Sequence, residues 1–257
     1  MTIHRTLIVM AAGLGVLATA PLAHAQQKGE FGSQGQFIFS ADRLVPLIAW
    51  SKQQTSANNQ NGGGNASEEQ STVSLLVGTT GNPEFESFYT PPRLGFDYTI
   101  IPNLTVGGDL FLVFGLASSA TTSNPNGNVS VNGPNNTAFG IAPRVGYILG
   151  LTDIFGIWLR GGISFYDANS SRPSGVVGCN STPSDSNGEY VFGVDLDPQL
   201  VITPINHFSF TVGPAVDLGF AGSASSTRYT GCNTSTTTSQ GYQQYNLGLT
   251  GGLLGWF

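Results

Sequence analysis

Apolar and polar residues alternate along much of the chain after about residue 34. In the clearest run, from Arg93 to Ile100, bulky apolar residues at even positions alternate with small or charged residues at odd positions. In a β-strand these two sets lie on opposite faces. The pattern therefore predicts strands with one bulky apolar face and one face of small and charged groups.

The same alternation recurs between turn-forming residues and predicts eight antiparallel strands. They cover residues 34–50, 84–100, 104–118, 137–150, 154–167, 189–203, 207–221 and 240–257. Their connections alternate between tight turns (101–103, 151–153, 204–206) and long segments rich in Gly, Asn, Ser and Thr (51–83, 119–136, 168–188, 222–239). Short turns at one end and long loops at the other are typical of outer-membrane barrels.

Three of the predicted hairpins form a degenerate repeat. Pro92-Arg93-Leu94-Gly95-Phe96 matches Pro143-Arg144-Val145-Gly146-Tyr147, and Pro198-Gln199-Leu200 matches both more loosely. A hairpin-sized repeat joined by short turns indicates up-and-down connectivity. Residues 72–78 (TVSLLVG) lie inside the first long connection, and we interpret them as a strand extension above the membrane.

Composition decides which face meets water. Only 9% of residues are charged, whereas a typical soluble domain has about 25%. A soluble barrel, the alternative that also alternates, would carry many Lys and Glu on its polar face. Here that face carries Gly, Ser, Thr and a few Arg and Asp, which suit the narrow interior of an eight-stranded barrel. The prediction is an all-β, eight-stranded, antiparallel up-and-down transmembrane β-barrel.

The predicted interior gathers charges of both signs. They are Arg93, Asp97, Asp109, Arg144, Arg160, Asp195, Asp197 and Asp217. Asp42 and Arg43 join them if a β-bulge interrupts the first strand, because alternation slips there. Unpaired charges in a narrow lumen cost several kcal/mol, roughly, so these groups must be paired or hydrated. Two interpretations stay open: a structural network that plugs the barrel, or a polar pathway for small solutes.

The N-terminus has the form of a secretory signal peptide. A short basic start, an apolar core and Ala23-His24-Ala25 predict cleavage between Ala25 and Gln26. The predicted organisation is a signal peptide over 1–25, a short periplasmic segment over 26–33 and a barrel over 34–257. Without Arg5, the 8 remaining basic residues face 15 acidic ones, which gives a net charge of −7. That charge argues against nucleic acid as a partner.

An exported chain with two cysteines permits a disulfide. Cys179 and Cys232 lie in the third and fourth long connections, where a bond would staple two outer loops. Free thiols are the alternative. Several aromatic residues near strand ends either form interfacial girdles or are ordinary strand composition. These residues are Tyr89, Tyr98, Phe165, Tyr166, Tyr190 and Phe208.

The chain resembles small outer-membrane barrels of the OmpA-transmembrane, opacity and OmpW type. The last strand ends in Phe257, and a C-terminal aromatic resembles the signal by which the barrel assembly machinery recognises its substrates. The stretches PRLGFDYTIIPNLTVGG, APRVGYILGLTD and TPINHFSFTVGPAVDLG resemble barrel proteins of myxobacteria in particular. The resemblance implies the fold and a bacterial outer-membrane location with both mature termini in the periplasm. It implies no activity.

Catalysis is not expected. After signal cleavage His207 is the one histidine, and it lies beside a predicted periplasmic turn. A hydrolase of the outer leaflet needs a base beside a nucleophile at the outer rim. We therefore expect no enzyme, no cofactor and no metal. Two functional hypotheses remain: a plugged, monomeric barrel with a structural or surface-display role, and an OmpW-like channel for small or apolar solutes. The expected partners are membrane lipids, the assembly machinery and a surface partner at the loops.

Overall fold

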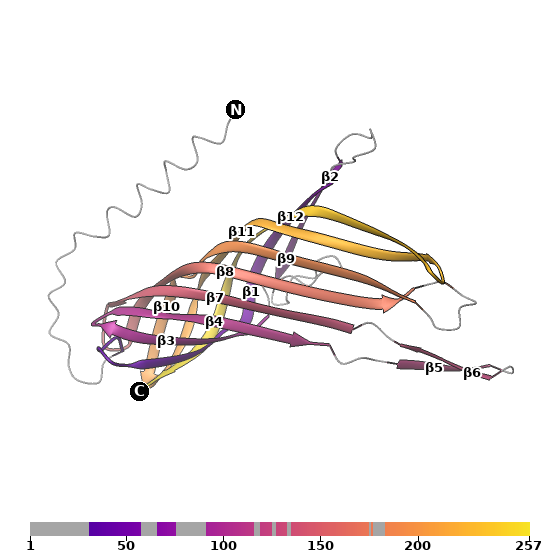
Figure 1. Ribbon diagram of the computed structural model, residues 1–257. Coiled ribbons are helices and arrows are strands. Elements are labelled where there is room, and N and C mark those ends of the chain that lie inside the picture. Colours follow the sequence, from indigo (N-terminus) through magenta and orange to yellow (C-terminus); the bar gives the residue numbers. More distant parts are fainter. Residues whose placement is uncertain are drawn as a thin grey trace, which may run out of the picture. The chain divides into compact units, whose positions relative to one another are not determined.

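The computed structural model describes residues 31–57, 66–75, 91–115, 119–124, 127–132, 135–174, 176 and 183–257 (Figure 1). The predicted cleavage site between Ala25 and Gln26, Tyr89 and Cys179 lie outside the described residues. Within these described residues, no helix is both long and apolar enough to cross a membrane.

Nearly all described residues belong to one closed antiparallel sheet (Figure 1). Ten strands form it. One of them, β2 (Ala66–Leu75), pairs with β1 off the ring, and β9 and β10 share a position, so the described ring has eight positions. The other strands are β1 (Phe37–Ala57), β3 (Arg93–Ile101), β4 (Leu104–Phe114), β7 (Asn135–Gly150), β8 (Phe155–Pro173), β9 (Ser184–Leu196), β10 (Gln199–Ile205), β11 (Phe208–Gly231) and β12 (Thr234–Trp256).

The predicted all-β antiparallel barrel is confirmed by this pairing. Going round the ring, β1 pairs with β3, β3 with β4, β4 with β7, and β7 with β8; β9 and β10 both pair with β8 and with β11, which pairs with β12. The ring closes where β1 pairs with both β12 and β3. At the seam, Phe37 and Phe257 exchange two backbone hydrogen bonds of 3.0 Å. A closed ring leaves no free sheet edge at this level, which is what a hydrocarbon environment requires of a β-structure.

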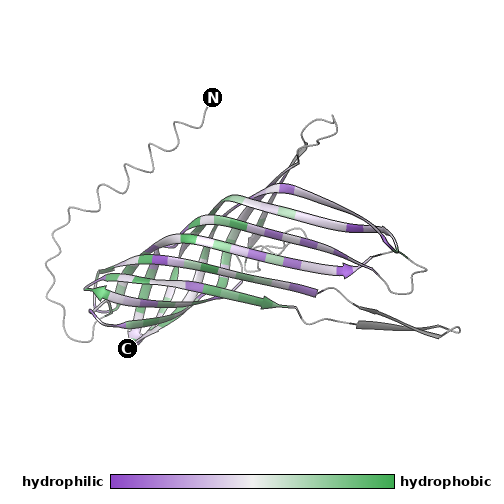
Figure 2. Cartoon of the chain, viewed as in Figure 1, coloured by the Kyte–Doolittle hydropathy of each residue, from purple (hydrophilic) through white to green (hydrophobic). Residues whose placement is uncertain are grey.

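The ring has charged and polar side chains on its inner face and apolar side chains on its outer face, the opposite of a soluble barrel. Along β3, Arg93 is 0% exposed whereas its neighbour Leu94 is 67% exposed. The strict alternation continues to Tyr98, and β7 shows the same pattern over most of its length. Figure 2 shows the apolar residues gathered in the half of the ring that holds the C-terminus. Polar side chains therefore fill the interior, and apolar side chains cover the outside of that half.

Prolines bear on two of the predicted strands. Of the strand predicted over 84–100, residues 84–90 lie outside the described residues, and the described part begins at Arg93, because Pro91 and Pro92 have no N–H to give to a ladder. The strand predicted over 189–203 is split at Asp197–Pro198 into β9 and β10. There the Asp197 N–H donates to the Arg160 carbonyl at 2.8 Å. The strand predicted over 104–118 ends at Phe114.

The predicted long connections are wrong in extent. The segment 222–239 is mostly strand, since β11 and β12 continue to a turn at Cys232–Asn233. Likewise β8 and β9 take up much of 168–188. Strand β2 begins before the predicted extension 72–78, whose last three residues lie outside the described residues. A separate hairpin, β5 (Ser119–Asn124) and β6 (Gly127–Asn132), lies within the predicted connection 119–136, and β7 begins before that connection ends, at Asn135.

The end of the ring near the C-terminus is closed by tight turns and a tucked segment. Asn103 and His207 take positive φ values of 70° and 68° in two of these turns. Phe31, in the predicted periplasmic segment, packs on Trp158 and Trp256 with ring centroids 5.7 and 5.1 Å away. The Asn103 N–H donates to the Gly32 carbonyl at 2.8 Å, which holds the segment across this end.

Candidate functional site

The polar face of the strands places the predicted lumen charges together. All eight predicted residues are at most 5% exposed inside the ring. Alternation explains this, because each of them stands at an inward position of β3, β4, β7, β8 or β11, or at the end of β9. Seven take part in ion pairs, namely Arg93, Asp97, Asp109, Arg144, Arg160, Asp197 and Asp217.

Arg144 is the hub of this network. Its guanidinium contacts three carboxylates: Asp97 at 2.6 Å, Asp42 at 2.9 Å and Asp109 at 3.2 Å. It also donates to the Ser40 hydroxyl at 3.2 Å. These partners come from β1, β3 and β4, so one side chain of β7 ties four strands together across the interior.

Arg160 extends the network toward β9 and β10. Its guanidinium contacts the Asp42 carboxylate at 2.9 Å and also pairs with Asp197. The Gln199 amide donates to the same Asp197 carboxylate. Asp42 thus bridges Arg144 and Arg160. Removing this one carboxyl would break two ion pairs at once.

A bulge in β1 brings Asp42 and Arg43 inside together. The pairing of β1 with β12 shifts between Ala41 and Val45, and Arg43 has a φ of 58°. This extra residue lets two consecutive side chains point inward, as the slip in alternation predicted. Arg43 makes two bonds to Asp217, at 2.6 and 2.9 Å. A left-handed backbone at a non-glycine residue costs about 1 kcal/mol or more, which the two charge-assisted bonds offset.

The last two residues of the charged layer, Arg93 and Asp195, differ in whether they make ion pairs. Arg93 lies 3.6 Å from both Asp109 and Asp217 and donates to the Tyr166 hydroxyl at 2.7 Å. Asp195 is 1% exposed and makes no ion pair with any residue in the described ranges. The buried carboxyls therefore outnumber the four buried arginines at this level, and neutralisation is incomplete at Asp195.

Two apolar layers enclose the charges. One lies toward the C-terminal end of the ring and contains Ile38, Ile148, Trp158, Val201, Leu254 and Trp256. The other lies toward the outer ends of the strands and contains Phe111, Ala138, Tyr166, Val191, Ala224 and Tyr242. Trp158 stacks under Arg160 and Arg144, at 4.6 and 5.5 Å from the ring centroid. Tyr166 faces Arg93 at 5.2 Å.

Tyr166 and Ser40 are functional contacts that the sequence analysis missed. For Tyr166 the sequence analysis left a girdle position and ordinary strand composition open, and the girdle is excluded because its side chain is buried inside the barrel. Alternation along the strand could have placed it correctly, because Tyr166 lies two residues from Ser164 and four from Gly162, and both of these are on the polar face. Phe165 and Tyr190, in contrast, lie on the outward face.

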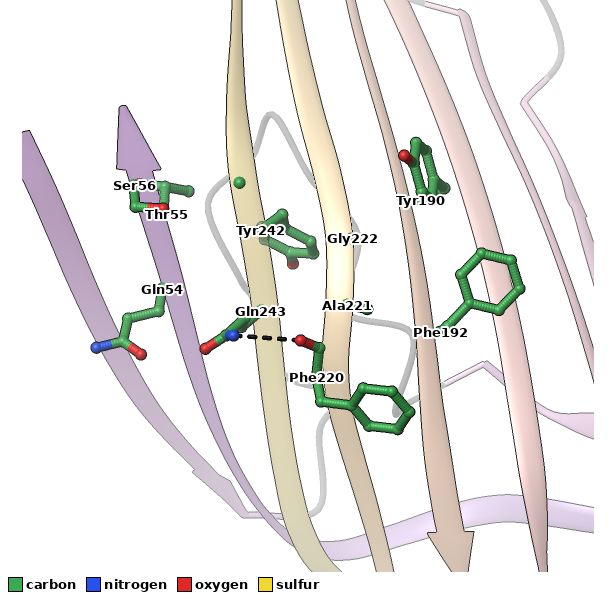
Figure 3. Close-up of a pocket in the computed structure, with 11 residues that line it drawn as sticks. Gln54, Thr55, Ser56, Tyr190, Phe192, Phe220, Ala221, Gly222, Tyr242 and Gln243 are labelled. Atoms are coloured by element: carbon green, nitrogen blue, oxygen red, sulfur yellow. Dashed lines mark hydrogen bonds between the residues drawn. The ribbon is translucent and has the colours of Figure 1, made fainter. Parts of the chain in front are cut away.

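A groove crosses the outer surface of the wall near the ends of β1, β12, β11 and β9 (Figure 3). Its volume is about 650 Å³. Aromatic Tyr190, Phe192 and Phe220 stand on one side, and the amides of Gln54 and Gln243 stand on the other (Figure 3). The groove follows a break in the ladder between β11 and β12, whose pairing stops at Gly219 and resumes at Ser223. Gln243 donates to the Phe220 carbonyl freed by this break, at 3.2 Å.

The remaining predicted residues stand apart from the charged layer. Among the described residues, no three His, Cys, Asp or Glu side chains are placed to hold a metal ion. His207 lies in a tight turn with its Nδ1 2.9 Å from the Trp256 carbonyl oxygen. Cys232 lies at the tip of the β11–β12 hairpin. The bond between Cys179 and Cys232 stays a prediction because Cys179 is outside the described residues.

No family model matches the chain, and no curated protein matches it. Solved structures of similar shape include OprG from Pseudomonas aeruginosa, at 11% identity and a TM-score of 0.44, covering 88% of this chain and 97% of that one. The outer-membrane protease OmpT from Escherichia coli is similar at 10% identity and a TM-score of 0.39, with 91% and 99% covered.

Ail, the attachment invasion locus protein of Yersinia pestis, is similar at 10% identity and a TM-score of 0.32, with 88% and 100% covered. Two of these three proteins, OprG and OmpT, are outer-membrane proteins by name. The likeness to myxobacterial barrels stays a prediction. The fold of this chain rests on its own strand pairing.

Proposed function

We propose that this chain is a bacterial outer-membrane barrel whose lumen is closed and whose role is structural or displayed at its outer rim. The observation that carries the proposal is the charged network of the interior. Nine interlocked charged side chains, from Asp42 to Asp217, lie between two apolar layers. An eight-stranded ring is only just wide enough for its own side chains, so this network supports a closed lumen.

Placement in the membrane is supported by the outer face. Exposed apolar residues run along the ring from Ile101 and Ile205 near the tight turns to Phe114, Phe139 and Phe220. Strand β4 spans this band with 11 residues, which suits the ~9–11 residues that a tilted strand needs to cross a bilayer. The tight turns and Phe257 then face the periplasm, and the β8–β9 and β11–β12 hairpins project outward. We also propose a signal peptide ending at Ala25, a monomeric barrel, and no enzymatic activity.

Reconstitution tests both parts of the proposal. The full chain without residues 1–25 is refolded into lipid vesicles, and single-channel conductance is recorded in planar bilayers beside a water-filled porin. We expect a folded, membrane-integrated barrel that gives no conductance steps. Reproducible steps from the folded protein would contradict the closed lumen. A polypeptide that stays dissolved without detergent would contradict the membrane location.

A second candidate function is exchange of apolar solutes along the outer wall. The groove beside Phe220 favours it, because an aromatic side faces an amide side at a break in the ladder. The test is uptake of N-phenylnaphthylamine into vesicles that carry the barrel. Phe220→Ser should slow uptake severalfold, and Phe210→Ser, on the same strand away from the groove, should not. Equal uptake with and without the barrel would exclude this function.

A further inference from the structure

On the outward faces of three neighbouring strands, aromatic side chains give way to polar ones at the same height along the barrel. Phe139 on β7, Phe165 on β8 and Phe192 on β9 form a strip of aromatic rings, with neighbouring centroids 5.6 and 4.6 Å apart. Tyr190 continues the strip at 6.3 Å from Phe192. Asp167 on β8 lies at the boundary, opposite Phe139 and Tyr190. Beyond it, and beyond Gly188 on β9, the outward positions toward the strand ends carry amides and hydroxyls, at Asn135, Thr137, Asn169, Ser171 and Ser186.

The polar side of this boundary is hollowed. A hollow of about 240 Å³ is lined by side chains that include Asn135, Thr137, Asn169 and Ser225. Gly188 provides the space: a Cβ there would stand 2.9 Å from the Asn169 Oδ1 and 3.4 Å from the Ser225 Oγ. The volume is below the roughly 300–1,000 Å³ of sites for drug-sized ligands, so it suits one small polar group.

The chemistry of the lining favours an uncharged ligand rich in hydroxyls. Amides and hydroxyls both donate and accept hydrogen bonds, as sugar hydroxyls do. Asp167, at the boundary, accepts a 2.7 Å bond from the Asn169 amide and places a carboxylate beside the hollow. The basic residue nearest along β8, Arg172, follows Ser171 and so points to the other face by alternation. A phosphate would meet this carboxylate, and no lysine or arginine is among the described residues that line the hollow.

We propose that the hollow binds the neutral sugar headgroup of a membrane glycolipid whose acyl chains pack on the aromatic strip below it. An amphiphile matches the site because the polar lining and the aromatic rings follow each other closely on the outward faces of the same strands. Gly188 is the next outward position after Tyr190 on β9, and on β8 only Asp167 stands between Phe165 and Asn169. This inference rests on the proposed placement in the outer membrane.

The test uses the full mature chain in phosphatidylcholine nanodiscs that contain a minor share of digalactosyldiacylglycerol or of phosphatidylglycerol. Native mass spectrometry counts the lipids that stay on the barrel. We expect retention of the galactolipid over phosphatidylglycerol. Gly188→Leu, which fills the hollow, and Asn169→Leu, which removes the amide, should each lower retention about fivefold, the value of one neutral hydrogen bond. Thr236→Leu, on the exposed end of β12, is the matched control and should leave retention unchanged.

Three results would overturn the inference: equal retention of both lipids, preference for the anionic lipid, or unchanged retention in both hollow variants. Free galactobiose in excess should not compete; if it does, the site takes soluble sugar and the glycolipid assignment is wrong. Heat-shifted gel mobility reports folding of every variant. A chain that fails to enter the nanodiscs contradicts the proposed membrane location, whereas an inserted barrel without galactolipid preference contradicts this inference alone.

Discussion

The interior of the ring and the outer hairpins both carry polar side chains, but in opposite surroundings. Inside, Arg144 and its three carboxylates are almost fully buried and are held in direct ion pairs. In the β11–β12 hairpin, pairs such as Thr227 and Thr237, whose hydroxyls lie 3.0 Å apart, are exposed to water. Water can replace a lost partner in the second region and cannot in the first. The same kind of substitution should therefore cost much more inside than outside.

The largest difference is expected at the hub of the charged layer. Arg144→Met removes the shared partner of Asp42, Asp97 and Asp109. Asp42 keeps Arg160 and Asp109 keeps Arg93, but the buried Asp97 loses the one ion pair that it makes with the described residues. Breaking a buried ion pair from one side costs about 3–5 kcal/mol. Urea unfolding of the barrel in lipid vesicles, followed by tryptophan fluorescence, measures this loss.

The matched control replaces an arginine in the outer region. Arg228 lies exposed on β11 near the hairpin tip, and Arg228→Met should change the free energy of unfolding by less than about 0.5 kcal/mol. Equal losses at the two positions would contradict the contrast between a dry interior and a hydrated rim.

The next largest loss of stability is expected for a substitution on the outward face. Leu110 stands midway along the lipid-facing band on β4 and is exposed. Lysine at the bilayer midplane costs about 2–4 kcal/mol in barrels of this kind, so Leu110→Lys should lower the free energy of unfolding by that amount. Thr236→Lys, on the exposed end of β12, should be nearly neutral. If Leu110→Lys is as mild as Thr236→Lys in the same vesicles, this face does not meet acyl chains.

A smaller loss is expected where a glycine makes room for the charges. A Cβ on Gly95 would stand 2.5 Å from the Arg144 Nη2 and would also overlap the Ser40 hydroxyl. Gly95→Val should therefore cost about 1–3 kcal/mol through overpacking. Gly150→Val is the control, because nothing lies within 4 Å of a Cβ built there. A neutral Gly95→Val would show that the charged layer can shift without loss.

The contrast also explains what the sequence could predict. Where lipid lies on one side and the packed lumen on the other, alternation is strict, and it placed Arg93, Asp97 and Arg144 on one face before any coordinates. In the outer hairpins water meets both faces, so Ser and Thr predominate and no period marks the strand. The sequence analysis therefore assigned the run from Thr234 to Ser239 to a loop.

Other features depend on contacts between distant strands. The sequence analysis grouped the lumen charges, but their pairing follows from register: Arg43 meets Asp217 across 174 positions of the chain. The wall groove and the hollow over Gly188 arise where four strands lie side by side, and no local pattern marks either one.

The smallest expected effect, and the last test of the contrast between interior and outer hairpins, concerns a pair of hydroxyls in the outer region. Thr227 and Thr237 face each other across β11 and β12, with their Oγ1 atoms 3.0 Å apart. Cross-strand pairs of this type contribute about 0.2–1 kcal/mol, and hydration should hold this pair at the low end. A double-mutant cycle of Thr227→Ala and Thr237→Ala measures the coupling, with Ser225→Ala and Thr237→Ala as the non-facing control. A coupling as large as the loss in Arg144→Met would mean that the hairpin is as dry as the lumen, and the two regions would no longer differ in kind.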